Sequence, residues 1–406
     1  MDRLLKTTFR RNVDRMPVFV KKLLTKKKVE RILSQLMSEA DLQQCLVDPT
    51  AKDQIIQKCM QKNHAVANKI VQNIEATLSN NAHFKDLDDN RKKQIREDML
   101  FCWYGYGFKI DEYIMYHFWD INIDHESRYS FLSDKELYAF RFCANDFTKT
   151  VYADKASAYH FLKKYYKRDM IVVTGEKDRE AFIEFACAKQ ALVKKPLDLA
   201  HGDGVSLVQI SEPSPENYVK YFESIKDEGE ILFEEVIEQH AAMKVFNADS
   251  LNTIRVYTLN TKNGIVIPTS IIRTGRLGSF VDNVSSGGVS ARIDVDTGTI
   301  ITDAIDKFGN RYVKHPDTQL QFKGFAIPQW DDLIGACKEA ATLTPELRFL
   351  GWDMAYSKDN GWVIVEVNTA PGMTATQASA LSGFKKDFMN ILPDMGLMIP
   401  FRFRKL

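Results

Sequence analysis

GWDMAYSKDNGWVIVEVNTAPGMT, residues 351–374, contains two short apolar runs joined by the turn-forming residues SKDNG at 357–361. Turn residues between two apolar runs are typical of a β-hairpin. Acidic side chains stand within both runs, where a plain core strand would carry aliphatic residues. A solvated face of an edge hairpin is one interpretation, and a binding site built on the hairpin is the other.

The alternation of side chains along a strand favours a site. Glu366 and Asn368 should point to one face, opposite Asp353 on the neighbouring run. The side chains expected on the other face, in a core, are Val363, Val365 and Val367. Two carboxylates and an amide oxygen, without His or Cys, suit Mg²⁺ shared with substrate phosphates. We therefore predict Asp353, Glu366 and Asn368 as metal ligands.

Composition is that of a globular protein with two or three domains: 406 residues, 45% hydrophobic, 27% charged and a net charge of +1. The six cysteines are scattered without a C-x-x-C pair, which argues against zinc and a disulfide framework. No apolar run approaches the length of a membrane-spanning helix, and the N-terminus lacks a signal-peptide apolar region. We expect a cytoplasmic protein.

Charge is concentrated in residues 1–31, which hold eleven Lys or Arg and three acidic residues, a net charge of +8. Apolar residues are interleaved, so the segment is either an amphipathic basic helix on an anionic membrane or polymer, or a helix docked by its apolar stripe.

The chain changes character near residues 100 and 150. The first hundred residues show helical periodicity at 28–48, 50–80 and 85–100. Residues 101–150 are rich in aromatic residues, which indicates a helical core or seam rather than a base-stacking surface, because no basic residues interleave. Later segments alternate, with strands predicted at 170–174, 191–195, 231–234, 253–260, 265–273, 289–294, 351–356 and 362–367. Helices are predicted at 154–167, 178–187, 214–226, 329–343 and 374–391.

Two lysines are candidate phosphate ligands. Lys195 ends a strand before Pro196, and the loop HGDGVSLV (201–208) follows with Gly202 and Gly204, which let backbone N–H groups approach phosphates. Lys155 lies at a predicted helix start, where anions bind well. An ordinary hairpin and a surface lysine are the alternatives.

The strand ILFEEVIEQH (231–240) runs into acidic residues. Its backbone at 235–237 is a candidate for pairing with an adenine edge, with a nearby acid for ribose hydroxyls; the candidate residues are Glu234, Glu235, Val236, Ile237 and Glu238. Arg255 alternates with aliphatic residues in NTIRVYTL (252–259), and Arg273 follows on the next strand. Together these arginines would line a polyanion site.

Taken in order, these elements resemble the ATP-grasp superfamily over about residues 150–375. The Asp353…Glu366-Val-Asn368 pattern is the most specific part. EVNTAPGMT is similar to the end of D-alanine–D-alanine ligases, but Gln377 stands where those ligases carry a substrate-binding Ser, and their N-terminal Gly-rich motif is absent. The sequence looks closest to the sugar-transfer-associated ATP-grasp proteins, in NTIRVYTL, VDNVSSGGV (281–289) and the aromatic block.

The resemblance implies an α+β fold in which two lobes hold ATP, after a helical N-terminal region. The domains expected are a helical region (1–100), an aromatic-rich domain (101–175), a small lobe (176–245) and a large lobe with the metal site (246–406). It also implies carboxylate–amine ligation through an acyl phosphate, with ATP and Mg²⁺ as cofactors. Lys155, Lys195, Arg255 and Arg273 would neutralise the transferring phosphoryl group and the intermediate.

Three functions follow from this. The first is a ligase that joins a carboxylate and an amine in surface polysaccharide biosynthesis, with small-molecule or glycan substrates and no nucleic acid. The second is an ATP-grasp kinase that stops after phosphoryl transfer to a hydroxyl or phosphate. The third is a nucleotide-binding scaffold, which the intact charged residues argue against.

Overall fold

The computed structural model describes residues 36–397 except 121–123, 147–150, 153, 190 and 198–203; before residue 36 it describes only Lys27, Glu30, Arg31 and Ser34. Most of the segment 1–31, whose amphipathic character was predicted, and the predicted glycine Gly202 therefore lie outside the described residues. None of the described helices has the length and apolar character needed to cross a membrane.

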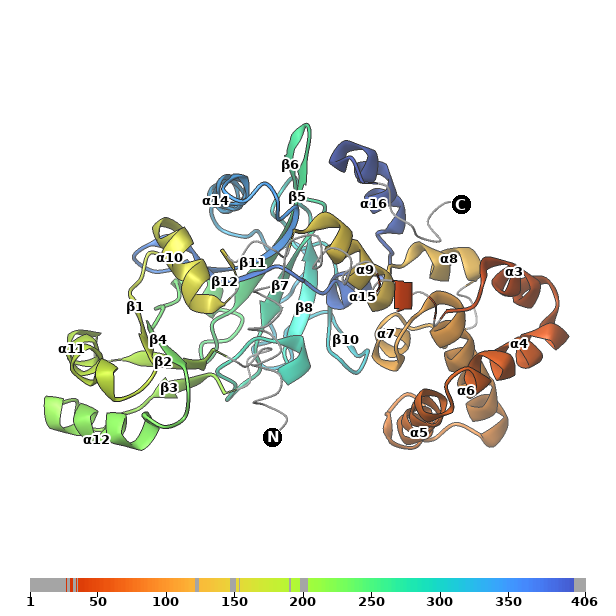
Figure 1. The fold of residues 1–406 in the computed structure, drawn as a ribbon, viewed down its shortest axis with the longest axis horizontal. Helices are drawn as coiled ribbons and strands as arrows, with labels where there is room; N and C mark the ends of the chain where they lie inside the picture. Colours follow the sequence, from red (N-terminus) through yellow and green to blue (C-terminus); the bar gives the residue numbers. More distant parts are fainter. Residues whose placement is uncertain are drawn as a thin grey trace.

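The first described part is a group of helices (Figure 1), as its periodicity predicts: α3 (Glu39–Val47), α4 (Pro49–Gln61), α5 (His64–Asn80) and α6 (Asp89–Phe101). The predicted helix over 50–80 is two helices. The reason is Asn63, whose side chain accepts a hydrogen bond from the backbone N–H of Val66 and so starts α5 as its N-cap. Ile70 and Ile74 of α5 are buried in the core of this region.

The aromatic block continues this core. It folds into a π-helical turn (Cys102–Tyr106), α7 (Ile110–Met115), α8 (His125–Ser130) and α9 (Asp134–Ala144). Its rings are buried against one another: the centroids of Tyr116 and Phe131 lie 4.5 Å apart, and those of Phe108 and Phe118 lie 5.0 Å apart. The expectation of a core rather than a base-stacking surface is confirmed.

A small antiparallel sheet follows, in the order β1-β4-β2-β3. Its strands are β1 (Met170–Val173), β2 (Leu192–Pro196), β3 (Ser206–Val208) and β4 (Ile231–Glu235). Helices α11 (Arg179–Lys189) and α12 (Pro215–Ile225) lie on one face, where Phe182, Phe222 and Phe233 form the core. The opposite face therefore carries the intervening residues of β2 and β4, among them Lys195 and Glu234.

The large sheet has the strand order β10-β9-β8-β7-β5-β11-β12, with β6 paired to β5. Its strands are β5 (Thr253–Thr261), β6 (Gly264–Val266), β7 (Ser270–Thr274), β8 (Val289–Ile293), β9 (Ala304–Ile305), β10 (Arg311–Tyr312), β11 (Phe349–Ser357) and β12 (Gly361–Asn368). Helices α10 (Lys155–Tyr166) and α14 (Trp330–Thr342) pack on one face, against Ile254, Trp352 and Ile364. Figure 1 shows this sheet between the small sheet and the N-terminal helices.

Two further predicted elements have the wrong extent. The predicted strand over 265–273 is interrupted between β6 and β7. The predicted helix over 374–391 is two helices, α15 (Thr374–Ala380) and α16 (Lys385–Ile391). Leu381 ends α15 with a φ of +48°, and a side chain at Gly383 would collide with the carbonyl of Ser130, so the chain cannot continue as one helix. The short helix α13 (Ala241–Lys244) precedes β5.

The predicted hairpin is β11–β12. Asp353 lies opposite Glu366, and Gly351 lies opposite Asn368. The strict alternation expected over Val363–Val367 is wrong, because a β-bulge leaves Val365 without a partner residue on β11. Ile364 and Val367 consequently pack against the same core, although an odd number of positions separates them. The predicted domain boundaries stay a prediction.

Candidate active site

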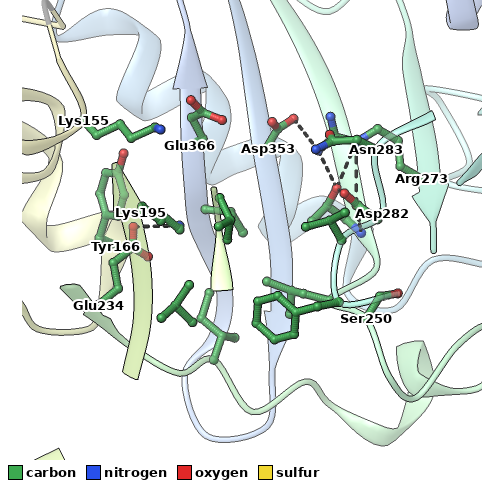
Figure 2. A pocket seen from close by; sticks show the side chains of 18 of the residues that line it. Lys155, Tyr166, Lys195, Glu234, Ser250, Arg273, Asp282, Asn283, Asp353 and Glu366 are labelled. Carbon is green, nitrogen blue, oxygen red and sulfur yellow. Dashed lines mark hydrogen bonds and ion pairs between the residues drawn. The ribbon is translucent and has the colours of Figure 1, made fainter. Parts of the chain in front are cut away.

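A cavity of about 940 Å³ lies between the small sheet and the large sheet. β2 and β4 form one wall, β7 and β12 form the other, and the start of α10 closes one side. Most of the predicted site residues line it: Lys155, Lys195, Glu234, Glu235, Val236, Ile237, Glu238, Arg273, Asp353, Glu366 and Asn368. Figure 2 shows Lys155 and Lys195 on one side, Asp282 and Arg273 on the other, and Glu366 and Asp353 between them.

Lys195 is buried and paired with an acid. Its Nζ lies 2.7 Å from Oε1 of Glu234, the neighbouring strand's carboxylate on the same face. Burial lowers the pKa of Lys195, and the charge of Glu234 opposes that shift. Burial alone would raise the pKa of Glu234, but the charges of Arg168 and Lys195 outweigh it, and the pKa lies below its ordinary value. Lys194 is on the opposite side of the strand and pairs with Glu228, as the register of the sequence predicts.

Lys155 is the first residue of α10, and its Nζ lies 3.4 Å from the carbonyl oxygen of Pro196, the residue after Lys195. The two predicted phosphate lysines therefore meet at one side of the cavity. Gly204, in the left-handed region with a φ of +73°, is not among the residues that line the cavity.

Asp353 is held by two arginines. Arg255 contacts it through both Nε and Nη2, the latter 2.7 Å from Oδ2, and Nη2 of Arg273 lies 3.1 Å from Oδ1. Burial would raise the pKa of Asp353, but these two positive charges outweigh it and lower the pKa. Arg255 lies behind Asp353 and does not line the cavity, whereas Arg273 does.

Glu366 differs from Asp353 because its carboxylate forms no hydrogen bond or ion pair with any described residue. It lines the cavity beside Asn368, whose Nδ2 donates to Oδ2 of Asp353 at 3.3 Å. That bond leaves the amide oxygen of Asn368 available as a ligand. A half-buried carboxylate and an amide oxygen next to it fit the hard-oxygen coordination of Mg²⁺. No group of three His, Cys, Asp or Glu suited to a metal occurs in the described part of the chain, so any further ligands would come from Asp353, water or substrate.

The segment after β4 is open to the cavity. Glu235 is 3.1 Å from Lys189, and Glu238 is 3.0 Å from Lys358. The backbone N–H and C=O groups of Val236 and Ile237 form no hydrogen bond with the described residues, although both residues line the cavity. Unpaired backbone groups of this kind are available to the edge of a planar heterocycle.

Comparison with known proteins bears on what this cavity holds. A family model described as sugar-transfer associated ATP-grasp matches residues 166–391, which span the small sheet, the cavity and the β11–β12 hairpin. The chain belongs to the sugar-transfer associated ATP-grasp family. The predicted family and α+β ATP-grasp fold are thereby confirmed, and an ATP-grasp ligase with ATP and Mg²⁺ as cofactors agrees with this membership.

Solved structures show partial similarity to this chain. The ATP-grasp ligase PsnB, complexed with a minimal precursor, has 13% identity and a TM-score of 0.36, over 59% of this chain and 58% of PsnB. D-alanyl-alanine synthetase A from Vibrio cholerae has 14% identity and a TM-score of 0.34, over 58% of this chain and 62% of the synthetase. This chain thus spans less than two thirds of either protein. No curated protein matches it.

The sequence of this ATP-grasp protein did not reveal every residue of the cavity. Thr253 and Asp282 were missed: Asp282 is buried beside Arg273 at 3.7 Å, and its Oδ2 accepts hydrogen bonds from both the N–H and the hydroxyl of Thr253. Burial raises the pKa of Asp282. Asp282 stands in the motif VDNVSSGGV, but an acid before a Gly-rich loop is common in strand connections, so the sequence does not indicate its partner.

Gln377, which replaces the substrate-binding Ser of D-alanine–D-alanine ligases, is fully buried and does not line the cavity. Its Oε1 accepts from the N–H of Leu132, and its Nε2 donates to the carbonyl of Leu132 and the hydroxyl of Tyr116. In this ATP-grasp protein the position therefore fixes α15 to the aromatic block.

Proposed function

We propose that the protein is an ATP- and Mg²⁺-dependent carboxylate–amine ligase that acts through an acyl phosphate. The observation that carries the proposal is the opposition of Lys195, on the small sheet, to the unpaired Glu366 and the adjacent Asn368, on the large sheet, across one cavity. Cations on one wall and hard oxygen ligands on the other are the two halves of a site for a nucleotide triphosphate.

In the first step a carboxylate oxygen of the acid substrate attacks the γ-phosphorus of ATP, and the bond from that phosphorus to the β,γ-bridging oxygen breaks. Lys155 and Lys195 lie where they would bind phosphate oxygens, and the backbone of Val236 and Ile237 would pair with the adenine edge. Glu366 and Asn368 would hold Mg²⁺, which when bound offsets the charge of the phosphates. Positioning and charge stabilisation supply most of the rate in such transfers.

In the second step an amine nitrogen attacks the acyl carbon, the carbon–oxygen bond to phosphate breaks and the nitrogen loses a proton, giving an amide and phosphate. Arg273 lines the cavity between Asp353 and Asp282, and its guanidinium would bind the acyl phosphate. Arg255 supports this arrangement through Asp353 and has no contact with the cavity.

The substrates belong to sugar chemistry in this proposal, as the family description suggests. The acid would be a uronic acid and the amine an amino acid or amino sugar, in surface polysaccharide biosynthesis. The cavity lining carries both signs of charge, including Asp282, Lys244 and Asp249, which suits a polar acceptor.

A hydroxylamine trap tests the reaction class. Candidate uronates and amino acids are first screened by thermal shift with ATP and Mg²⁺, because bound ligand stabilises the native state. The acid that shifts the melting temperature is then incubated with ATP, Mg²⁺ and hydroxylamine without amine. We expect a hydroxamate with the wild-type protein and none with Glu366→Gln. A stable phosphate ester or anhydride as product would instead establish a kinase and refute the ligase.

A further inference from the structure

Arg168 connects the two walls of the cavity, and it contributes to neither the predicted phosphate site nor the predicted metal site. It lies in the short link between α10 and β1, and only 7% of the residue is exposed. Its planar guanidinium is the one group on this link that reaches both β4 of the small sheet and β12 of the large sheet, within the described residues.

The contact with the small sheet is a charge pair. Nε of Arg168 lies 3.1 Å from Oε2 of Glu234, and Nη2 lies 2.6 Å from the same oxygen. The other oxygen of Glu234 accepts from Lys195. The carboxylate of Glu234 is therefore shared between Arg168 and the predicted phosphate lysine, and its orientation depends on both cations.

Arg168 contacts the large sheet at the β-bulge of β12. Nη1 of Arg168 donates to the carbonyl of Ile364 at 2.5 Å, and Nη2 is 3.4 Å from the carbonyl of Val365. Val365 is the extra residue that the β11–β12 ladder leaves unpaired, and Glu366 follows it. A bulge redirects the next side chain of its strand, so a donor fork on these carbonyls fixes the direction of Glu366.

We propose that Arg168 is a positioning residue that sets the metal-binding carboxylate Glu366 through the bulge and links it to Lys195 through Glu234. The inference rests on the proposed function, because it gives Glu366 its role toward Mg²⁺. In this arrangement, the coupling between nucleotide binding and Mg²⁺ binding depends on the guanidinium of Arg168, which lies outside both sites.

The substitution Arg168→Lys distinguishes the contact with Glu234 from the contact with the bulge carbonyls. Its ammonium is a single point charge, so it can still neutralise Glu234 but cannot hold Glu234 and two carbonyls in one plane. Arg168→Lys should therefore leave Lys195 and its partner in place while it releases the bulge.

A purely structural arginine would give a different result, and Arg128 provides the matched control. It also binds a carboxylate and a carbonyl, Asp98 at 2.7 Å and Phe118 at 2.7 Å, with a side chain only 12% exposed. It belongs to the helical aromatic block and does not line the cavity. Arg128→Lys should lower stability without altering any response to Mg²⁺.

The experiment measures ADP binding by calorimetry to the full chain, once in EDTA and once in saturating Mg²⁺. We expect Mg²⁺ to tighten ADP binding to the wild type by about tenfold or more, the usual size of a coupling between two ligands. Arg168→Lys and Glu366→Gln should each reduce that factor to about twofold or less. Arg168→Lys should do so with its ADP affinity in EDTA within about twofold of the wild type. Arg128→Lys should keep the full factor.

A double-mutant cycle completes the test. If Arg168 acts through Glu366, the double variant Arg168→Lys/Glu366→Gln should show the same Mg²⁺ factor as either single variant. Arg168→Gln, which keeps a donor for one carbonyl, is the second variant if the lysine protein does not fold. Full Mg²⁺ enhancement in a folded Arg168 variant would overturn the inference and leave the proposed function standing. A wild type without ADP binding, or without Mg²⁺ enhancement, would overturn the proposed function itself.

Discussion

Neutralising the two carboxylates of the β11–β12 hairpin should have different effects: loss of the Asp353 charge should lower stability, and loss of the Glu366 charge should lower turnover. Asp353 is 3% exposed and paired with Arg255 and Arg273, whereas Glu366 has no partner among the described residues. Asp353→Asn would leave two buried guanidinium groups facing a neutral amide. Breaking a buried ion pair by removal of one partner costs about 3–5 kcal/mol. For a domain of about 150–250 residues, that loss corresponds to a fall in melting temperature of about 6–20 °C.

Glu366→Gln removes a charge that forms no hydrogen bond or ion pair with the described residues, so the free energy of unfolding should change by no more than about 0.5 kcal/mol. Turnover should nevertheless fall by at least about 10²–10³-fold, the loss that follows removal of one group stabilising a developing charge. The pair of variants thus separates a carboxylate that stabilises the fold from one that serves the reaction.

Thermal unfolding without nucleotide measures the first effect, and ATP-dependent hydroxamate formation measures the second. Glu366→Gln protein that unfolds as early as Asp353→Asn would contradict the assignment of Glu366 as the free carboxylate. Wild-type turnover by folded Glu366→Gln would refute its role toward Mg²⁺.

The remaining predictions concern three other positions. Lys195→Met should weaken ADP binding by about tenfold or more through loss of one charge-assisted contact, while Lys194→Met, on the opposite side of the strand, should not; calorimetry distinguishes them. Gln377→Ser should lower the free energy of unfolding by about 2–4 kcal/mol, measured in urea, because it leaves several buried polar groups unpaired. Burial lowers the pKa of Lys135 from 10.5 in the unfolded chain to about 8, so burying the charged lysine destabilises the folded state by about 3 kcal/mol at pH 7, partly offset by the ring of Trp103 at 4.2 Å. Lys135→Met should therefore stabilise the protein by about 1–2 kcal/mol at pH 7, and this gain should shrink as pH rises from 8 toward 10.5, where the wild-type lysine folds neutral; a gain independent of pH would contradict it.

Local sequence patterns predicted the parts of the site that depend on one strand. Alternation placed Glu366 and Asn368 on the face of the hairpin that carries Asp353, and it placed Lys195 rather than Lys194 in the cavity. Strand periodicity is a property of the backbone, so it can be read without knowing what the strand packs against. The same rule failed at Val365, because a bulge depends on the register of both strands in the pair.

Contacts between the two lobes could not be predicted from the sequence, for a related reason. Arg168 stands in the run YYKRDM (165–170), which reads as an ordinary basic end of a helix. Its burial arises only when Glu234 of β4, 66 residues further along the chain, and Ile364 of β12, 196 residues further along, meet on either side of it. Arg255 shows the converse: its strand and face were predicted, but not that Asp353 would lie between it and the cavity.

The pairing of charges explains why this site can bind a polyanion without first rearranging. Lys195 is matched by Glu234 and Arg273 by Asp353, so the buried cations are stabilised before any substrate arrives. Because Glu234 also binds Arg168 and Asp353 also binds Arg255, each of these acids has two cations beside it and keeps its pKa low. Of these four cations, Lys195 and Arg273 line the cavity, where they would contact a triphosphate. Glu366, the acid with no cation bound to it in the described chain, is then the carboxylate best placed to receive a metal that accompanies the phosphates.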